Sequence, residues 1–392
     1  MNEQKETAMK ERAIRTALGH LARGRSLTED QAMEAMAVVM EEGLSPTLMA
    51  AFLMGLRGKG ETVDEIVGCA RAIRARSAPF PGARPGLVDT CGTGGDGSGT
   101  FNISTTAAFM VAGAGVEVAK HGNRAVSSAT GSADMLEALG VEVTMDGREA
   151  SEALDTAKIT FLFAPVFHAA MRHAAPVRRE LGVRTIFNLL GPLCNPAGAS
   201  AQVVGVFDGE LVRPVAEALA RLGARRAMVV HGADGLDELT VTGPSKVAEW
   251  NGATIREWTV QPEDIGLRLR RAEELQGGSA AVNATIARRV LAEGGQGEEG
   301  DSPAEAARTE APTAHPQAAR DVVLLNAAAG LVVAERAGDL REGLELARAA
   351  VDSGAALDRL EGLVGFSGKV RQRRRAPRVE PTVPIMGTGW GR

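Results

Sequence analysis

The residues with the clearest chemical potential lie in a glycine-rich segment, LVDTCGTGGDGSGTFNIST, which places five glycines between positions 92 and 99. The apolar LVD predicts a strand before this loop, and the residues after it predict a helix that Ser104 or a neighbour can cap. Glycines let backbone N–H groups approach an anion closely, and a helix N-terminus adds a favourable dipole. Small side chains supply further donors: Thr100, Asn102, Ser104 and Thr105. The segment therefore predicts a phosphate or pyrophosphate site, with a flexible glycine turn as the alternative.

The loop alone does not select one phosphate ligand. Gly92, Gly94 and Gly97 match the dinucleotide fingerprint, but that fold also needs an acid about 20 residues further on, at the end of the second strand. Here Glu117 begins the next predicted strand and Lys120 ends it. A Walker A loop is excluded because no Gly-Lys-Ser/Thr follows. Asp96 would bring a carboxylate close to a diphosphate, which requires a metal ion or a ligand hydroxyl.

A second polar loop follows the strand predicted at 116–119, in the segment KHGNRAVSSATGS. Lys120 and Arg124 bring positive charge to a strand end, and Ser132 is expected to cap the next helix. His121 is open to a structural or a catalytic interpretation. If the two strands are parallel neighbours, both loops surround one polyanion. The loop's small donor positions are Ser127, Ser128, Gly131 and Ser132.

The elements that must position these loops differ along the chain. Residues 10–78 predict helices, with capping boxes at Thr28 and Thr62, a Ser45-Pro46 start and a stop at Gly43. Beyond 82, short apolar runs alternate with alanine-rich helical stretches, which indicates an α/β domain with a mostly parallel central sheet flanked by helices. The runs lie at 87–89, 116–119, 160–164, 202–207 and 227–231.

Composition narrows the class of protein. The 392 residues carry a formal net charge of −5, which argues against a general nucleic-acid binder. The chain also has few aromatic residues, which argues against a protein that binds single-stranded nucleic acid by base stacking. The three cysteines are far apart, so neither a disulfide framework nor a structural zinc site is expected. The charged N-terminus lacks a secretory apolar region, and no stretch is long enough to cross a bilayer. We therefore expect a cytoplasmic protein without a membrane partner.

Two segments look like additions to the predicted helical and α/β regions. Residues 293–318 are rich in Gly, Pro, Ala and acid, which predicts a flexible surface insertion. The end of the chain, 371–392, is expected to be a basic flexible tail. A solvated tail is favoured there over a polyanion-binding patch. Its basic cluster comprises Lys369, Arg371, Arg373, Arg374, Arg375 and Arg378.

The two loops together resemble those of the anthranilate phosphoribosyltransferase family. GTGGDGSGTFNIST and KHGNRAVSS carry the resemblance first. Further matches follow in order from about 15 to 370: FLFAP (161–165), APVRRELGVRTIFNLLGPLCNPA (175–197), DGLDELT (234–240) and LLNAAAGLVVA (324–334). The ordered set is far more specific than any one of its motifs.

The resemblance implies two substrates, 5-phosphoribosyl 1-pyrophosphate and anthranilate, with Mg²⁺ as cofactor and no covalent nucleophile. Anthranilate would be held by Gly92, Asn123 and Arg178, and Mg²⁺ by Ser104, Asp237 and Glu238. Adjacent hard oxygen ligands suit Mg²⁺ bridged to a pyrophosphate, and an arginine fork suits a carboxylate. The phosphoribosyl pyrophosphate site would comprise Gly92, Gly95, Asp96, Thr100, Asn102, Ile103, Ser104, Thr105, Lys120, His121, Gly122, Asn123, Arg124, Ser127, Ser128 and Ser132.

The resemblance also implies a homodimer and a small N-terminal helical domain, 1–82, with which helices near 168–200 pack. The α/β domain would span 83–370. The implied reaction, in tryptophan biosynthesis, is a magnesium-assisted displacement with inversion that yields N-(5-phosphoribosyl)anthranilate. Three other functions stay open from the residues alone: a pyrimidine nucleoside phosphorylase, a nucleic-acid binder using the basic tail, and a dehydrogenase.

Overall fold

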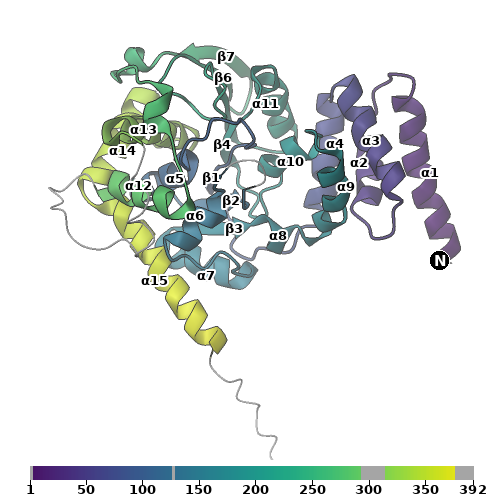
Figure 1. The fold of residues 1–392 in the computed structure, drawn as a ribbon, viewed down its shortest axis with the longest axis horizontal. Coiled ribbons are helices and arrows are strands. Elements are labelled where there is room, and N and C mark those ends of the chain that lie inside the picture. Colours follow the sequence, from purple (N-terminus) through teal and green to yellow (C-terminus); the bar gives the residue numbers. More distant parts are fainter. Residues whose placement is uncertain (1–2, 126–128, 293–313, 376–392) are drawn as a thin grey trace, which may run out of the picture.

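The computed structural model describes residues 3–125, 129–292 and 314–375 (Figure 1). The chain begins with a helical bundle at one end of the molecule, as predicted. Its four helices are α1 (Glu3–Leu21), α2 (Glu29–Val39), α3 (Pro46–Lys59) and α4 (Val63–Arg74).

Local capping explains where the bundle helices begin. The capping boxes at Thr28 and Thr62 are both present, as predicted. Ser45 precedes α3 but makes no side-chain cap hydrogen bond, so Pro46 at the first helical position is the part of that prediction that holds. The predicted stop at Gly43 is wrong, because α2 ends at Val39 and Met40 caps it through backbone hydrogen bonds.

A seven-stranded sheet forms the second domain, with the order β3-β2-β1-β4-β5-β6-β7. The first five strands pair in parallel, which confirms the mostly parallel sheet. The last two form an antiparallel hairpin that the sequence analysis missed. The strands are β1 (Val88–Thr90), β2 (Val118–Gly122), β3 (Ile159–Phe163), β4 (Ala201–Gly205), β5 (Arg226–Gly232), β6 (Ser245–Trp250) and β7 (Ile255–Val260).

Helices cover both faces of this sheet, and an apolar core lies between the sheet and the helices on each face. One core packs beneath α5 (Ile103–Gly113) and α13 (Pro316–Val333). The other joins the bundle to the opposite face and includes Val177 and Leu190. The remaining helices are α6 (Ser132–Ala138), α7 (Gly147–Ala157), α8 (Ala164–Phe167), α9 (Ala175–Leu181), α10 (Phe187–Leu193), α11 (Val212–Arg221), α12 (Ala280–Ala292), α14 (Leu340–Asp352) and α15 (Ala355–Arg375).

Several expectations need correction. The cap position of α5 belongs to Asn102, a neighbour of Ser104 as the sequence allowed, but Asn102 makes no side-chain cap hydrogen bond. Ser132, expected as a cap, is instead the first residue of α6 after Gly131. Residues 371–375 of the expected flexible tail are helical, because α15 continues to Arg375 and Arg374 pairs with Glu149 of α7. Arg378 and residues 293–313 of the expected insertion lie outside the described residues, and the last residues of that insertion are helical because α13 begins at Pro316. No described helix is long and apolar enough to cross a membrane.

A buried polar network ties β1 to its neighbours beneath the predicted loops. The Asp89 carboxylate accepts hydrogen bonds from the backbone N–H of His121 at 3.1 Å and from the Asn195 amide at 2.8 Å. The same amide donates to the Ala119 carbonyl at 2.8 Å. Burial raises the pKa of Asp89 to about 6, so its contribution to stability falls as pH rises from the ordinary aspartate range to about 6.

Replacing Asn195 with Ala should therefore lower the free energy of unfolding by about 2 kcal/mol at neutral pH, because a buried carboxylate loses a donor. The loss should be smaller below pH 6, where the protonated carboxyl needs that donor less. Urea denaturation at the two pH values measures both effects. Asn251→Ala makes the same chemical change in an exposed turn and should cost less. An equal loss at both pH values would contradict this account of the network.

Candidate functional site

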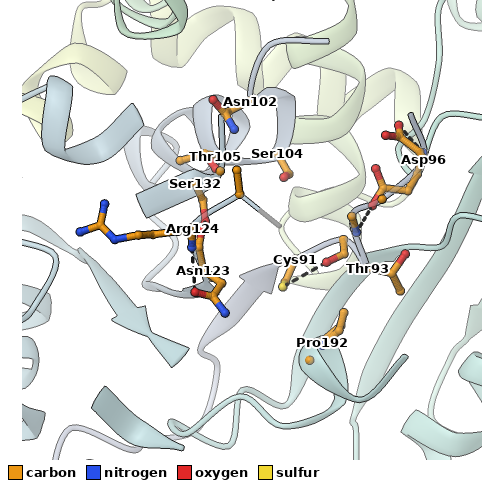
Figure 2. A pocket seen from close by; sticks show the side chains of 18 of the residues that line it. Cys91, Thr93, Asp96, Asn102, Ser104, Thr105, Asn123, Arg124, Ser132 and Pro192 are labelled. Atoms are coloured by element: carbon orange, nitrogen blue, oxygen red, sulfur yellow. Dashed lines mark hydrogen bonds between the residues drawn. The ribbon is translucent and has the colours of Figure 1, made fainter. Parts of the chain in front are cut away.

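A cavity of about 340 Å³ lies where the ends of β1 and β2 meet the α9–α10 segment. Figure 2 shows the two predicted loops on opposite sides of it, with Asn123 and Ser132 on one side and Thr93 and Asp96 on the other. Of the predicted residues, only Ser127 and Ser128 are not placed, since they lie outside the described residues. The others all line this cavity: Gly92, Gly95, Asp96, Thr100, Asn102, Ile103, Ser104, Thr105, Lys120, His121, Gly122, Asn123, Arg124, Ser132, Arg178, Asp237 and Glu238.

The glycine loop follows a path that L side chains rarely adopt. Gly94, Gly95, Gly97 and Gly99 all have positive φ, between 67° and 76°. Hydrogen bonds hold the ends of the loop: the backbone N–H of Thr93 donates to the Gly205 carbonyl at 2.9 Å, and the Gln276 amide donates to the Ser98 carbonyl at 3.1 Å. The glycine loop therefore has a defined backbone path that presents a fixed surface, in contrast to the flexible turn given above as the alternative.

The second loop offers fewer unpaired cationic side chains to the cavity than expected, because one of its two cations is paired with acids of α6. Figure 2 shows Arg124 extending away from the glycine loop, and its guanidinium pairs with Asp134 and Glu137 of α6 at 2.9 and 2.6 Å. Lys120 is buried beside the cavity, where its ammonium donates to the Thr90 carbonyl. Ser132 donates to the Asn123 carbonyl at 3.1 Å. Lys120 is thus the cation of this loop that is placed to act within the cavity.

Two adjacent carboxylates face the glycine loop. Asp237 accepts from the backbone N–H of Gly94 at 2.6 Å, and Glu238 accepts from the backbone N–H of Ser104 at 3.2 Å. Both residues are only 9% exposed. The close approach of the loop to Asp237 requires glycine at 92, because a Cβ there would overlap the Asp237 carboxylate; glycine at 205 of β4 likewise leaves room for the Asp237 backbone carbonyl. The acids and the loop are therefore packed together as one unit.

The charge balance of this unit favours a divalent cation. Burial, together with repulsion from Glu238 and Asp96, raises the pKa of Asp237, and burial raises that of Glu238 to about 7. No group of three or more His, Cys, Asp or Glu among the described residues is arranged to hold a metal by itself. Mg²⁺ typically takes one or two carboxylates and completes its shell with water and substrate phosphates. The carboxylate pair fits that mode of binding.

Asn326 of α13 supports the acids from behind and was not predicted as a site residue. Its amide donates to the Leu239 carbonyl at 2.8 Å and its oxygen accepts from the Leu239 N–H at 3.1 Å. It is 2% exposed and holds the residue that follows Glu238. Asp234 accepts from the Thr240 hydroxyl at 2.7 Å on the other side. The Asn326 contacts join residues distant in sequence, so no local pattern reveals them.

The other end of the cavity is partly apolar and offers a cation. The Arg178 guanidinium lies 4.9 Å from the centre of the Phe187 ring, and burial lowers its pKa. Burial also lowers the pKa of His121 to about 3, and its Nδ1 lies 3.1 Å from the Gly191 carbonyl. The Nδ1 contact fits a structural role for His121, and its buried Nε2, which has no hydrogen-bond partner among the described residues, leaves one ring nitrogen for a ligand in the cavity. Further lining residues not predicted are His168, Met171, Asn188, Leu190 and Pro192.

The arrangement separates two kinds of subsite within one cavity. One end combines the glycine loop, Lys120 and two carboxylates, which suits a pyrophosphate with a bound cation. The other combines an arginine with apolar side chains, which suits a flat, negatively charged molecule. Such a cavity can hold a phosphorylated electrophile and an aromatic nucleophile side by side.

Comparison with known proteins agrees with this geometry. The model described as "Glycosyl transferase family, a/b domain" matches residues 84–357, and "Glycosyl transferase family, helical bundle domain" matches 15–77. The anthranilate phosphoribosyltransferase of Moorella thermoacetica is 52% identical over 353 residues, covering 90% of this chain and 98% of its own length. That of Symbiobacterium thermophilum is 49% identical, covering 91% and 99%.

Solved structures lead to the same family. The anthranilate phosphoribosyltransferase of Thermus thermophilus superposes with a TM-score of 0.80 at 45% identity, covering 91% of this chain and 99% of that one. The Saccharomyces cerevisiae enzyme in complex with PRPP and Mg gives 0.79 at 26% identity, covering 92% and 99%. The chain belongs to the anthranilate phosphoribosyltransferase family, as its sequence motifs predicted.

Proposed function

We propose that this chain transfers the phosphoribosyl group of 5-phosphoribosyl 1-pyrophosphate to the amine of anthranilate, in tryptophan biosynthesis. The products are N-(5-phosphoribosyl)anthranilate and pyrophosphate. The observation that carries the proposal is that a glycine loop and buried carboxylates lie opposite Arg178 in one cavity. The yeast relative has been solved with PRPP and Mg and, separately, with 4-fluoroanthranilate, which supports both substrates.

The pyrophosphate end would be bound by the glycine loop and Lys120, with hydroxyl donors from Ser104 and Thr105. Ser127 and Ser128 stay part of the proposed set on the family motif alone. Arg124 would contribute through its backbone and its contact with α6, since its guanidinium already pairs with acids there. These groups stabilise the negative charge that grows on the departing pyrophosphate.

Mg²⁺ would be held by Asp237, Glu238 and the Ser104 hydroxyl. When bound, the ion neutralises phosphate charge and orients the leaving group. Glu238 accepts from the N–H of Ser104, so the proposed ligands already adjoin one another. Asn326 keeps the carboxylates in place through Leu239.

Anthranilate would lie between Arg178 and Asn123, near Gly92, with its carboxylate on the arginine fork. Its aryl amine is neutral near pH 7, so the cavity needs no strong base to activate it. The amine attacks the anomeric carbon from the face opposite the pyrophosphate, with inversion, through an oxocarbenium-like state; the anomeric C–O bond to pyrophosphate breaks as the C–N bond forms, and the amine releases one proton. No residue is required as a covalent nucleophile, and positioning and electrostatics supply the catalysis.

We also infer a cytoplasmic homodimer. All three cysteines are free and buried, which suits a reducing compartment. Met54 on α3 of the helical bundle is 39% exposed and is a candidate for burial in a dimer contact.

The direct test mixes the protein with anthranilate, 5-phosphoribosyl 1-pyrophosphate and Mg²⁺ and follows anthranilate fluorescence. The fluorescence should fall, and chelation of Mg²⁺ should prevent the fall, because the buried carboxylates need the cation to receive a pyrophosphate. No loss at high protein concentration would contradict the proposal. Phosphate-dependent release of base from uridine or thymidine would favour the nucleoside phosphorylase alternative.

Arg178→Ala should raise the KM for anthranilate by at least about tenfold, with little change in the KM for 5-phosphoribosyl 1-pyrophosphate. Arg178→Lys should restore part of the loss, because lysine keeps the charge but lacks the planar fork. Steady-state kinetics with each substrate varied in turn separates the two effects. Equal losses for both substrates would contradict the proposed role of Arg178.

A further inference from the structure

We propose that Arg184 couples the two substrate subsites by joining the glycine loop to the segment that carries Arg178. This inference rests on the proposed function. Arg184 is exposed, and its guanidinium donates to the backbone carbonyl of Gly95. The same guanidinium lies 4.2 Å from the centre of the Phe207 ring. Two contacts thus hold one exposed side chain against the loop.

The residue that contacts Gly95 comes from a different part of the fold than the other residues that hold the loop. Gly205, Asp237 and Gln276 contact it from the α/β domain. Arg184 contacts it from the α9–α10 segment, whose apolar residues pack with the helical bundle. The backbone N–H of Phe207 donates to the Thr93 hydroxyl at 3.1 Å, so the ring beneath Arg184 is itself fixed to the start of the loop.

The segment from Arg178 to Asn188 is built as a stiff unit. The N–H of Gly182 donates to the Arg178 carbonyl at 3.2 Å and closes α9. The N–H of Thr185 donates to the Asn188 side chain at 3.0 Å, and Arg178 lies over Phe187. Arg184 lies between these contacts, six residues after Arg178, so we expect a displacement of Arg184 to move Arg178 as well.

Energetic coupling follows from the glycine content of the loop. Hydrogen bonds already hold the ends of the loop, and pyrophosphate would further restrain positive-φ glycines between them, such as Gly95 and Gly97. The Arg184 contact links that restraint to the position of Arg178, so either ligand should make the other bind more tightly. Arg184 is not among the described residues that line the cavity, so it acts on Gly95 from outside. It is a positioning residue.

The test measures the anthranilate dissociation constant by calorimetry, with and without saturating Mg²⁺ and pyrophosphate. For the unmodified protein, we expect pyrophosphate to tighten anthranilate binding by about fivefold or more. Arg184→Ala should bring this factor close to one, and Arg184→Lys should restore only part of it. Arg179→Ala removes a neighbouring exposed charge on α9 and should keep the full factor.

Hydrogen exchange gives a readout that does not depend on ligands. The amides of residues 94–97 should exchange faster in Arg184→Ala than in Arg179→Ala, while the melting temperatures stay alike because both side chains are exposed. An unchanged coupling factor in Arg184→Ala would overturn the inference, as would the absence of coupling in the unmodified protein. If the unmodified protein bound neither ligand, the proposed function itself would fail.

Discussion

The buried carboxylates of Asp237 and Glu238 are the constraint around which the rest of the site is arranged. Each accepts a backbone N–H from the glycine-loop side, from Gly94 at 2.6 Å and Ser104 at 3.2 Å. Two charges this buried are costly unless a cation compensates them. Lys120 supplies one positive charge nearby, and a divalent cation carried with a polyphosphate would supply the rest. The raised pKa values of both acids reflect the cost of burying them, and this charge balance favours a divalent cation at the site.

The fold meets this constraint by bringing parallel strand ends to one edge. β1 and β2 deliver the two loops, and α13 holds the acids through Asn326. The α9–α10 segment closes the cavity from the bundle side with Arg178 and reaches the loop with Arg184. The site is therefore shared between the two apolar cores. Small movements between them would change the distance between the proposed substrates, and a catalyst that works by positioning is sensitive to that distance.

Sequence patterns succeeded where the signal is local. Both capping boxes and the five parallel strands were predicted, because each depends on residues close in the chain. The β6–β7 hairpin was missed, although Asn251-Gly252 between its strands is a strong turn signal. The Arg124 guanidinium was expected to face the anion, but it pairs instead with two acidic side chains of α6. The roles of Asn326 and Arg184 depend on tertiary contacts that no spacing in the sequence encodes.

The most direct test of the central claim compares the binding of 5-phosphoribosyl 1-pyrophosphate with and without Mg²⁺ in two proteins, the unmodified chain and a double variant, Asp237→Asn with Glu238→Gln. Calorimetry gives both dissociation constants. The buried carboxylates predict that Mg²⁺ tightens binding to the unmodified chain by about tenfold or more, and that the neutral variant loses this dependence. An equal response to Mg²⁺ in both proteins would contradict the claim that these two acids hold the ion.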